Sequence, residues 1–557
     1  MNLGLDVGGT QTDAVLVSEG RVQAHAKVVN RPDLIQTLSL ALDQVLSGAN
    51  PSCIRRMVFS TTMATNAIVQ DRLDAAGMIV SAGPGMNPEW FSVGPSYHVV
   101  PGVLDHRGEE ITPLSEAAVK NAAAKIHGQD IESVGIAGKF SVRNPLHELT
   151  AAQWLEGRFS YLALGHRFSG SLNFPRRITT AYLNAALHRV HHGFESSLRH
   201  VLEARNLRAP RYLMKPDGGT VRLSASSGFP AQTAQSGPAA SVMGALALDG
   251  CPGHTLIMDI GGTTTDMALV LSGVPLCVPQ GIALGPFRTN IRSLLTRSIG
   301  MGGDSAITDT GRTIRIGPLR QGPPMAFGGP VPTPTDALVT LGLLKEGDPG
   351  RAREAMEKIG GPRGWDAATT ASQVLEQMAR SLAISAKAFV HYVNSRPVYT
   401  IYEVIEGATI APDGVVVLGG PAAQLAPFLE KAVDLPCRLP PHYDVANAVG
   451  AAASRVTTEV SLQADTRRGT LVIPEAGLES PIRRDFNMET AMEAARQSLA
   501  KRALDEGADI TDLDFSVTEK EEFNMIRNGL RAGRNIRIKL SVVPGLVPEW
   551  TRKEAAC

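Results

Sequence analysis

The chain has 557 residues, of which 43% are apolar and 19% charged, a balance typical of a globular protein with two to four domains. Its 54 Lys and Arg residues equal its 54 Asp and Glu residues, so the charge gives no indication of a nucleic-acid or anionic-membrane partner. No apolar run reaches the roughly 18 residues of a membrane span, and five scattered cysteines without a C-x-x-C pair predict a cytoplasmic protein without disulfides or a zinc site.

The elements in chain order begin with two strands joined by a Gly-Gly-Thr turn, at residues 2–7 and 14–17. The opening residues MNLGLDVGG lack the basic and apolar regions of a signal peptide and are expected to be a strand of the fold. Further strands are predicted at 22–29, 57–62, 75–85 (with a turn) and 133–140, and helices at 33–48 and 115–128. This alternation predicts a parallel or mixed sheet covered by helices.

The second half of the chain repeats the alternation with longer helices. Helices are predicted at 179–206, in the second part of 225–248, and at 368–393 and 445–454, with strands at 254–260 and at the start of 414–433. Between 271 and 336 the chain is rich in Gly and Pro, and a loop-dense segment of this length is typical of a functional region.

Beyond about residue 456 the composition becomes more charged. The stretch 485–557 is predicted to be a small α+β unit with strands at 512–520 and 534–543. We therefore expect an N-terminal lobe at 1–175, a second lobe at 176–455 and a C-terminal appendix at 456–557.

The strongest organisational signal is an internal repeat. The segment DVGGTQTDAVLV (6–17) matches DIGGTTTDMALV (259–270) at eight of twelve positions, and both follow an apolar strand. One such turn alone would be an ordinary hairpin, so the inference depends on the second copy. The repeat predicts two duplicated halves that begin alike.

The residue types of the repeat suit a phosphate chain. Glycines allow the backbone to approach a ligand, and successive N–H groups in such a turn form a concave site for an anion. The carboxylates of Asp6 and Asp259 would repel phosphate unless Mg²⁺ lies between them, so we expect these two residues to organise Mg²⁺. Two turns facing one cleft would hold a nucleotide tail from both sides. The predicted phosphate-binding residues are Gly8, Gly9, Thr10, Thr12, Gly261, Gly262, Thr263 and Thr265.

Three further segments fit a nucleotide cleft. In VVVLGGPAA (415–423), Gly419 and Gly420 would let a flat base lie against the backbone, although an ordinary strand-to-helix turn is an equal alternative. The segments SGPAASVMGA (236–245) and NAVGAAAS (447–454) predict helices that cross closely. Such a crossing suits either a hinge between lobes or simple tight packing.

In this order, the five segments resemble the phosphate, connecting and adenosine motifs of the actin–hexokinase–Hsp70 ATPase superfamily. Within it, the chain resembles the hydantoinase/oxoprolinase family, in its hydantoin-utilisation protein A (N-methylhydantoinase A) branch. Besides the two repeats, the segments that carry the resemblance are FSTTMATNAIVQ (59–70), FSVRNPLHE (140–148), RRITTAYLNAAL (176–187), SGPAASVMGA, FRTN (287–290), IGMGGDSAI (299–307), FGGPVPTPTDALVTLG (327–342) and NAVGAA.

The resemblance implies an α/β fold with duplicated actin-like ATPase (ribonuclease H-like) lobes around a nucleotide cleft, followed by the small α+β appendix. It implies that ATP and Mg²⁺ are used to open a cyclic amide, such as a hydantoin or a 5-oxoproline-like lactam, by phosphorylating the amide oxygen. Two alternatives remain open. One is the ATP-using subunit of a ketone carboxylase, of the acetone carboxylase type, and the other is a nucleotide-dependent regulatory switch.

The resemblance also assigns roles to residues. Asp13 or Asp266, with Asp13 preferred, would orient the substrate N–H or act as a base, the alternative being a turn-capping Asp. Arg177 and Asn184 lie two turns apart on one helix and would meet an acyl oxygen, the alternative being a solvated Arg and an interhelical Asn. Gly302 and Gly303 belong to a loop expected near the phosphates. The predicted substrate wall comprises Thr61, Thr62, Thr65, Asn66, Thr335 and Asp336.

The chain departs from the family pattern at Asp304 of GMGGDS, where the family usually has another glycine. A carboxylate there would oppose ATP unless it joins the Mg²⁺ shell or points away. The neighbouring segment GPLRQGPPMAF (317–327) also differs from the sequence that is usual in the family. The chain shows no second catalytic module after residue 456, so a separate hydantoinase B-type subunit and an oligomer are expected as partners.

Overall fold

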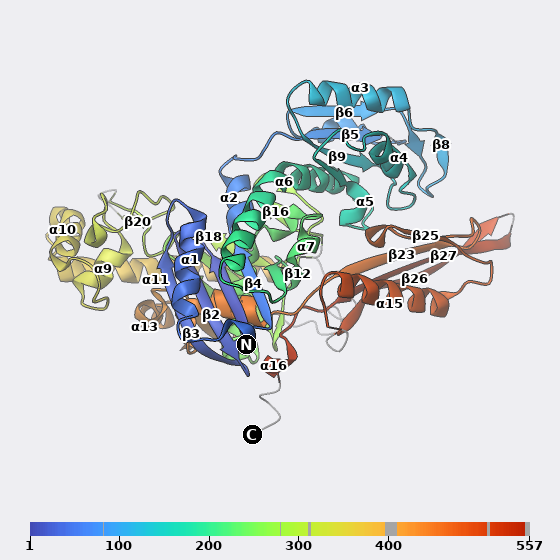
Figure 1. Ribbon diagram of the computed structural model, residues 1–557. Helices are drawn as coiled ribbons and strands as arrows, with labels where there is room; N and C mark the ends of the chain where they lie inside the picture. The colour runs from blue at the N-terminus through green and yellow to red at the C-terminus, as the bar shows by residue number, and fades with distance from the viewer. Residues whose placement is uncertain are drawn as a thin grey trace.

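The computed structural model of the chain describes residues 1–81, 83–278, 280–309, 313–395, 409–509, 513–527 and 529–551 (Figure 1). Two open sheets lie at its centre, a third sheet projects from the first lobe, and a fourth is formed by the C-terminal region. Within the described residues, no helix combines the length and apolar character needed to cross a bilayer.

The first sheet has the strand order β12-β11-β4-β1-β2-β3. β1 pairs antiparallel with β2 and parallel with β4, so the first Gly-Gly-Thr turn closes a hairpin at the middle of the sheet. Leu38 and Leu42 of α1 and Leu198 of α6 cover one face. The elements are β1 (Asn2–Val7), β2 (Gln11–Ser18), β3 (Arg21–Val29), α1 (Leu34–Val45), β4 (Arg56–Thr61), α6 (Phe174–Glu203), β11 (Arg211–Met214) and β12 (Thr220–Arg222).

The second sheet repeats this topology. β13 pairs antiparallel with β14 and parallel with β21, and the order β15-β14-β13-β21-β22 matches β3-β2-β1-β4-β11 of the first sheet. The duplication inferred from the repeat is therefore present as two lobes of one topology. The strands are β13 (His254–Ile260), β14 (Thr265–Leu271), β15 (Val274–Pro275), β18 (Thr296–Ile299), which also pairs with β14, β21 (Gly414–Leu418) and β22 (Cys437–Arg438).

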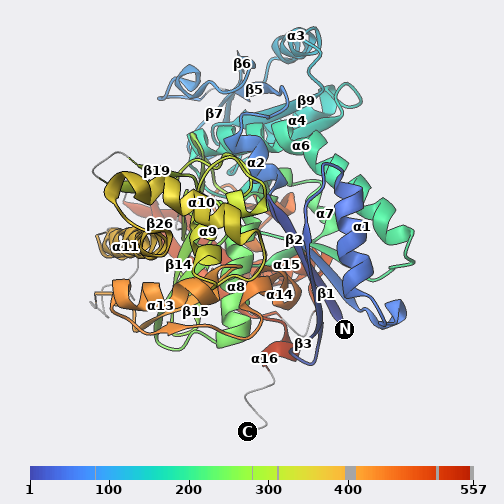
Figure 2. The ribbon, with the colours of Figure 1, turned by 90° about the vertical axis from the view of Figure 1, so that its left-hand side faces the viewer.

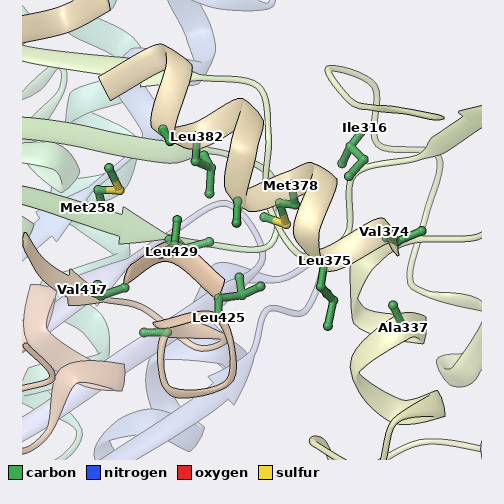
Figure 3. Close-up of a cluster of buried hydrophobic side chains, with 14 of the residues drawn as sticks. Met258, Ile316, Ala337, Val374, Leu375, Met378, Leu382, Val417, Leu425 and Leu429 are labelled. Atoms are coloured by element: carbon green, nitrogen blue, oxygen red, sulfur yellow. The ribbon is translucent and has the colours of Figure 1, made fainter. Parts of the chain in front are cut away.

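The outer face of the second sheet carries the largest apolar cluster. Met258 and Val417 of the sheet pack against Met378 and Leu382 of α11 and Leu425 of α13, as Figure 3 shows. The same cluster includes residues of α9 and α10. The helices are α9 (Pro334–Thr340), α10 (Pro349–Gly360), α11 (Ala367–Asn394) and α13 (Ala422–Val433).

Two helices of small residues lie crossed between the sheets (Figure 2). α8 (Ser236–Asp249) packs on the inner face of the second sheet, and α14 (Ala446–Ala453) packs on the first. A Cβ at Gly244 would lie closer than 3.0 Å to Ala446 O, and one at Gly450 would lie equally close to Ala240 O. The close crossing predicted from the small residues is therefore confirmed.

A four-stranded parallel sheet, of order β10-β9-β5-β6, is inserted between β4 and α6 of the first lobe. Val119 and Ile126 of α3 and Ala151 of α4 cover one face, while the first half of α6 covers the other. The elements are α2 (Met63–Val69), β5 (Gly77–Ser81), β6 (Ser96–Val100), α3 (Glu116–His127), β9 (Ser133–Gly138), α4 (Leu146–Trp154), β10 (Tyr161–Leu164) and α5 (Gly165–Phe168).

The C-terminal region forms an antiparallel sheet of order β25-β24-β23-β27-β26 under one helix, α15. Its last described residues return to the crossed helices, where Trp550 Nε1 donates to Ala247 O of α8 at 2.5 Å and the Trp550 ring packs against α14. The elements are β23 (Glu459–Asp465), β24 (Thr470–Ile473), β25 (Leu478–Pro481), α15 (Met488–Asp505), β26 (Phe515–Arg527), β27 (Leu530–Val542) and α16 (Pro548–Thr551).

Strand membership differs from the predicted boundary at 175. β11 and β12 complete the first sheet although they follow that position, and α6 spans it. The first lobe therefore extends to Arg222, because its last strands come after the long helix. The remaining short elements are β7 (Val103–Leu104), β8 (Glu110–Thr112), α7 (Leu223–Ser226), β16 (Ala283–Leu284), β17 (Phe287–Arg288), β19 (Ile307–Asp309) and β20 (Ile314–Ile316).

Candidate active site

Each Gly-Gly-Thr turn joins two strands that carry facing carboxylates. Asp6 of β1 is the cross-strand partner of Asp13 of β2, and Asp259 of β13 is the partner of Asp266 of β14. Like charges directly opposite each other destabilise a sheet. These pairs lie beside the turn of each hairpin, and we call the two turn ends with their aspartates the hairpin mouths. The presence of facing carboxylates there indicates a role other than stability. Asp13 and Asp266 are strand residues, so the turn-capping alternative does not describe them.

The two hairpin mouths meet around Asn447 of α14. Asn447 Nδ2 donates to Asp6 Oδ2 at 3.3 Å, and its side chain also lies near Asp259, where it opposes the rise in the pKa of that carboxyl. Ser241 Oγ of α8 donates to Asp259 Oδ2 at 2.5 Å. Burial raises the pKa of both Asp6 and Asp259, and the charge of Asp259 raises the pKa of Asp6 further. The crossed helices thus bring the two aspartates together.

The chemistry of this carboxylate cluster fits a hard divalent cation. Asp6 Oδ1 and Asp266 Oδ1 are buried and have no hydrogen-bond partner among the residues that the structure describes. Among the described residues, no group of three or more His, Cys, Asp or Glu side chains could hold a metal. Mg²⁺ does not need such a group, because one or two carboxylates suffice when water and phosphate oxygens complete its octahedron. Asp6 and Asp259 are therefore suitable ligands for Mg²⁺.

The backbone of the two turns is equivalent, but their surroundings differ. Gly8 N donates to Gln11 O at 3.0 Å, and Gly261 N donates to Thr264 O at 2.9 Å. A Cβ added at Gly9 would meet nothing within 4 Å, whereas one at Gly262 would lie 2.8 Å from Asp304 Oδ2. The first turn is therefore open to a ligand, while the second is flanked by a carboxylate.

Two of the four predicted hydroxyl donors are not available. Thr12 and Thr265 are fully buried; Thr12 Oγ1 donates to Asn30 Oδ1, and Thr265 Oγ1 donates to Met301 O, both at 2.7 Å. The prediction that these two threonines donate to phosphate is wrong, because each hydroxyl proton is already used to fix its hairpin. Thr10 and Thr263, half-buried in the turns, remain candidates.

The loop containing Gly302 and Gly303 lies directly against the second turn. Gly303 N donates to Gly261 O at 3.0 Å, and a Cβ at Gly302 would lie closer than 3.0 Å to the Gly261 and Gly262 backbone. The need for glycine at 302 is therefore steric. Gly302 and Gly303 therefore pack against the backbone of the second turn and support it. Their predicted contact with the nucleotide stays a prediction.

Asp304 is paired with the neighbouring segment that also departs from the family pattern. Arg320 Nη2 of GPLRQGPPMAF lies 3.3 Å from Asp304 Oδ2, and Thr335 Oγ1 donates to Asp304 Oδ1 at 3.3 Å. Burial raises the pKa of Asp304, and Arg320 opposes that shift. The two segments that differ from the family pattern are thus joined by an ion pair between Asp304 and Arg320. Arg320 neutralises the carboxylate that would otherwise oppose phosphate at Gly262.

We expect Arg320→Met to weaken ATP binding about tenfold, because it leaves an unpaired carboxylate beside the second turn. Asp304→Gly should bind ATP at least as well as the parent, and the double variant should recover parental affinity. Isothermal titration with ATP measures all three. A double variant as weak as Arg320→Met would contradict this account and would instead show that Arg320 itself contacts the nucleotide.

Gly419 and Gly420 follow β21 at the same edge of the second sheet. Gly419 has φ +95°, its N–H donates to Tyr443 O at 3.0 Å, and a Cβ there would lie within 3.0 Å of Ile260 O and Asp259 Oδ1. A Cβ at Gly420 would meet nothing within 4 Å. Gly419 therefore allows close packing against Asp259, and Gly420 is the one that is open to a base.

The polar loop after β4 lies against the first turn. Thr62 N and Oγ1 both donate to Val7 O, at 3.2 and 3.3 Å, and Asn66 Nδ2 donates to Thr62 Oγ1 at 3.4 Å. Thr61 Oγ1 accepts from Met63 N, and Thr65 Oγ1 accepts from Gln235 N at 2.7 Å. The structure thus gathers these four predicted residues beside the first turn, where Thr62 and Asn66 are half-buried.

The pair Thr335–Asp336 divides into two different roles. Asp336 is fully buried and accepts hydrogen bonds from the backbone of Met325, Ala326 and Thr333, forming a capping box at the start of α9. It does not line the cleft, so its predicted contact with substrate is corrected to a structural role. Thr335 remains near the site, since it contacts Gly303 and Asp304.

Arg177 and Asn184 are enclosed by protein rather than presented to a cleft. Arg177 is fully buried, with Nη1 donating to Ser141 Oγ and Nη2 to Gly138 O, and it lies 4.0 Å from Glu148. Asn184, also fully buried, donates to Thr180 O and accepts from Ala231 N. Protein groups surround both side chains, so neither is placed to contact an acyl oxygen. The alternative of a solvated Arg177 is also wrong, because this side chain is fully buried.

Sequence reasoning missed three residues that shape the site. Asn447 was visible only as part of a small-residue helix, although a polar side chain in NAVGAAAS is itself a signal. Lys27 forms an ion pair with Asp13 at 2.9 Å, and Asn30 Nδ2 donates to Gly8 O at 2.8 Å. The alternation of β3 gave no indication that these two side chains meet the first hairpin.

Comparison with known proteins gives consistent matches over most of the chain. The model of the hydantoinase/oxoprolinase N-terminal region matches residues 2–159, and that of hydantoinase/oxoprolinase matches residues 177–460. The caprolactamase alpha subunit of Pseudomonas jessenii is 26% identical over 383 residues, covering 62% of this chain and 55% of that subunit. The chain thus spans just over half the length of that relative.

Two longer matches cover nearly the whole chain. The acetophenone carboxylase gamma subunit of Aromatoleum aromaticum is 24% identical over 596 residues, covering 95% of this chain and 77% of that subunit. A nucleotide-free acetone carboxylase structure, from work on ATP-dependent acetone carboxylation, superposes with a TM-score of 0.71 at 17% identity, covering 98% of this chain and 87% of that one. The predicted α/β fold, with two duplicated lobes and a small C-terminal α+β appendix, is confirmed.

Proposed function

Because the chain belongs to the hydantoinase/oxoprolinase family, we propose that it is the ATP-using subunit of an enzyme that opens a cyclic amide. The substrate class is a hydantoin or a 5-oxoproline-like lactam. An unstrained amide is a poor electrophile, and phosphorylation of its oxygen makes the ring carbon open to attack by water. In such a reaction the protein mainly positions the reactants and neutralises charge.

The observation that carries the proposal is the meeting of the two hairpin mouths around Asn447. It concentrates the carboxylates of Asp6, Asp13, Asp259 and Asp266 beside two turns of glycine backbone. Mg²⁺ held by Asp6 and Asp259 would supply the positive charge that a triphosphate requires at such a place. Gly9 and Thr10 of the first turn, and Thr263 of the second, would then bind phosphate oxygens.

Asp266 is the better candidate for the base. Burial raises its pKa to about 7, with Asp259 and Asp6 adding to the shift and Ser298 opposing it, and its Oδ1 accepts no hydrogen bond from the part of the chain that the structure describes. Burial also raises the pKa of Asp13 to about 7, but Asp13 is held by Lys27 at 2.9 Å. A carboxylate with a pKa near the working pH and a free oxygen suits removal of the amide N–H proton as the amide oxygen is phosphorylated.

Asp266→Asn should lower kcat at least 100-fold and remove the rise of rate with pH near pH 7, since only the deprotonated carboxylate acts as a base. Asp13→Asn should lower kcat less and retain the rise. The pH profile of substrate-dependent phosphate release separates the two. If Asp13→Asn, and not Asp266→Asn, loses the pH dependence, the assignment of the base is reversed.

A second function has a specific observation in its favour. The alignment with the acetophenone carboxylase gamma subunit covers 95% of this chain, against 62% for the caprolactamase alpha subunit. The same site would then phosphorylate the enolate oxygen of a ketone. Both relatives are named as subunits, so we propose a partner chain that completes the reaction in either case.

The experiment that tests the proposal is phosphate release from ATP by the purified chain, with and without a panel of hydantoins, 5-oxoproline, small lactams and ketones. Stimulation by one ring, lost in Asp259→Asn, supports the cyclic-amide function. Stimulation by a ketone that also depends on bicarbonate supports the carboxylase function. ATP binding without stimulation by any compound, in the presence of proteins co-purified from the native host, would overturn both.

A further inference from the structure

A cavity of about 330 Å³ lies between the inserted region of the first lobe and the C-terminal sheet, outside the nucleotide site. Its walls include the apolar side chains of Phe140, Leu172 and Met525 and the polar side chains of four arginines. Small-molecule sites have volumes of about 300–1,000 Å³, with apolar walls and a few convergent polar groups. The cavity has both properties. In Figure 1 the two regions lie on the same side of the molecule.

The floor of the cavity results from strand alternation in the C-terminal sheet. Leu462 of β23 and Ile536 and Ile538 of β27 point toward α15 and form its apolar core. The residues between them point the other way, so Gln463 and Arg537, which are cross-strand partners, share the face away from α15. Polar side chains are usual on the face of an antiparallel sheet away from its core, but here residues of the inserted region lie opposite that face.

The opposite wall comes from the inserted region, and the two walls are joined. Arg468 Nη1 donates to Arg107 O, and Arg468 Nη2 donates to Gly108 O at 3.2 Å. Arg143 projects from the segment after β9 and lines the same cavity. Burial, with the charge of Arg537 adding to it, lowers the pKa of Arg143 to about 10, and both cations line the cavity.

Within the described ranges of the chain, four polar atoms around the cavity are buried without a hydrogen-bond partner. They are the donors Arg143 Nε and Arg537 Nε and the acceptors Gln463 Oε1 and Asn535 Oδ1. A buried polar group without a partner destabilises the folded protein, so four such groups at one place point to a polar occupant. Their chemistry defines that ligand, because the two donors need an anion and the two acceptors need an N–H or O–H group.

The charges near the cavity agree with this reading. Arg107, Arg143, Arg468 and Arg537 line it, against one lining carboxylate, Asp465, whose Oδ1 already accepts from the N–H groups of Arg467 and Arg468. Glu519 acts on Arg143 from β26, and Glu521 lies 3.8 Å from Arg537. The arginines outnumber these three carboxylates, and Arg143 has no carboxylate within ion-pair distance among the described residues.

We propose that this cavity binds a small carboxylate that also carries an amide or amine N–H. Arg143 and Arg537 hold the carboxylate, Gln463 and Asn535 accept from the N–H, and Phe140 and Leu172 contact the carbon atoms. The site stands on its own contacts and does not depend on the proposed function. Ring-opened cyclic amides belong to this ligand class. If the chain acts on a cyclic amide as proposed, the cavity would therefore bind the ring-opened product.

The test uses N-acetylglycine as the probe, titrated calorimetrically into the full chain at constant ionic strength. Acetate, which lacks the N–H, and N-methylacetamide, which lacks the charge, are the comparison compounds. Binding of N-acetylglycine at least tenfold tighter than either is expected. Arg143→Gln and Arg537→Gln should each weaken it tenfold or more, while ATP affinity and thermal stability remain within error of the parent.

The matched control is Arg534→Gln. Arg534 lies on the same strand as Arg537 but on the α15 face, 3.4 Å from Glu522 and outside the cavity, so its loss should leave the affinity unchanged. Equal affinity in the parent and both cavity variants, or equal affinity for all three compounds, would overturn the proposal. Failure of the ring panel above would not, because this titration needs no turnover.

Discussion

Asp259→Asn is expected to abolish substrate-dependent phosphate release, with a loss of kcat of about 1,000-fold or more, comparable to removal of a principal charged group from other active sites. The substitution keeps the shape that Ser241 and Asn447 contact, but it removes the charge that would hold Mg²⁺. Release of phosphate by purified protein at saturating ATP measures the effect. Retention of even a tenth of the parental rate would contradict the assignment of Asp259.

The same variant should be more stable than the parent above neutral pH. Burial raises the pKa of Asp259, so the folded protein binds that proton more tightly than the unfolded chain does, and stability is lost as the pH rises toward the folded pKa. An amide at 259 avoids this loss. Thermal unfolding should therefore show a higher melting temperature than the parent at pH 8, and this difference should disappear at pH 4.

Asp249→Asn is the matched control. Asp249 lies at the end of α8 and forms two hydrogen bonds with Arg438, at 2.8 and 3.0 Å, away from the hairpin mouths. Its loss should leave phosphate release unchanged and lower the stability by about 1 kcal/mol. Opposite signs of the two stability changes would show that Asp259 is retained for a purpose other than folding.

The duplicated hairpins could be predicted because the repeat gives both the turn and the flanking strands. The burial of Thr12 and Thr265 could also be predicted from the sequence, although the prediction that they bind phosphate is wrong. Thr12 shares its strand face with Ala14 and Leu16, and Thr265 shares its face with Met267 and Leu269, all of them buried. Period-two alternation therefore places both hydroxyls in the interior, and only Thr10 and Thr263 of the turns escape it.

Asp336 illustrates a second signal that local sequence contained. Thr333-Pro334-Thr335-Asp336 precedes the apolar run of α9, with Pro at the first position and an acidic residue three positions after Thr. That pattern predicts a helix N-terminus closed by reciprocal side-chain bonds. The capping pattern is the more specific of the two signals, since the Gly- and Pro-rich composition before it indicates a loop but assigns no contact to Asp336.

The remaining features depend on contacts between distant segments. Asn447 is 441 residues from Asp6, and Asp304 meets Arg320 only because a loop folds back on the second turn. The boundary of the first lobe has the same origin, since β11 joins β4 after the chain has passed through the inserted sheet and α6. No local pattern specifies such pairings, because they follow from the order in which strands join a sheet.

The crossing of α8 and α14 gives the second large effect. Gly450→Ala is expected to destabilise the protein by about 3 kcal/mol or more, because the new Cβ would overlap Ala240 O and Gly244 N of α8. α14 cannot move away from α8, since a Cβ at Gly4 of β1 would already lie closer than 3.0 Å to Ala448 O on its other side. The backbone of α8 on one side and that of β1 on the other thus confine α14.

Gly193→Ala isolates this effect from helix propensity. Gly193 lies in α6, and a Cβ there would meet nothing within 4 Å, so the same substitution should stabilise the chain by roughly 0.5–1 kcal/mol. Denaturant unfolding measures both changes. Equal shifts in the two variants would contradict the confined crossing. Since α14 also carries Asn447, any displacement of this helix should separate the two hairpin mouths, and phosphate release in Gly450→Ala should fall even at temperatures where the variant remains folded.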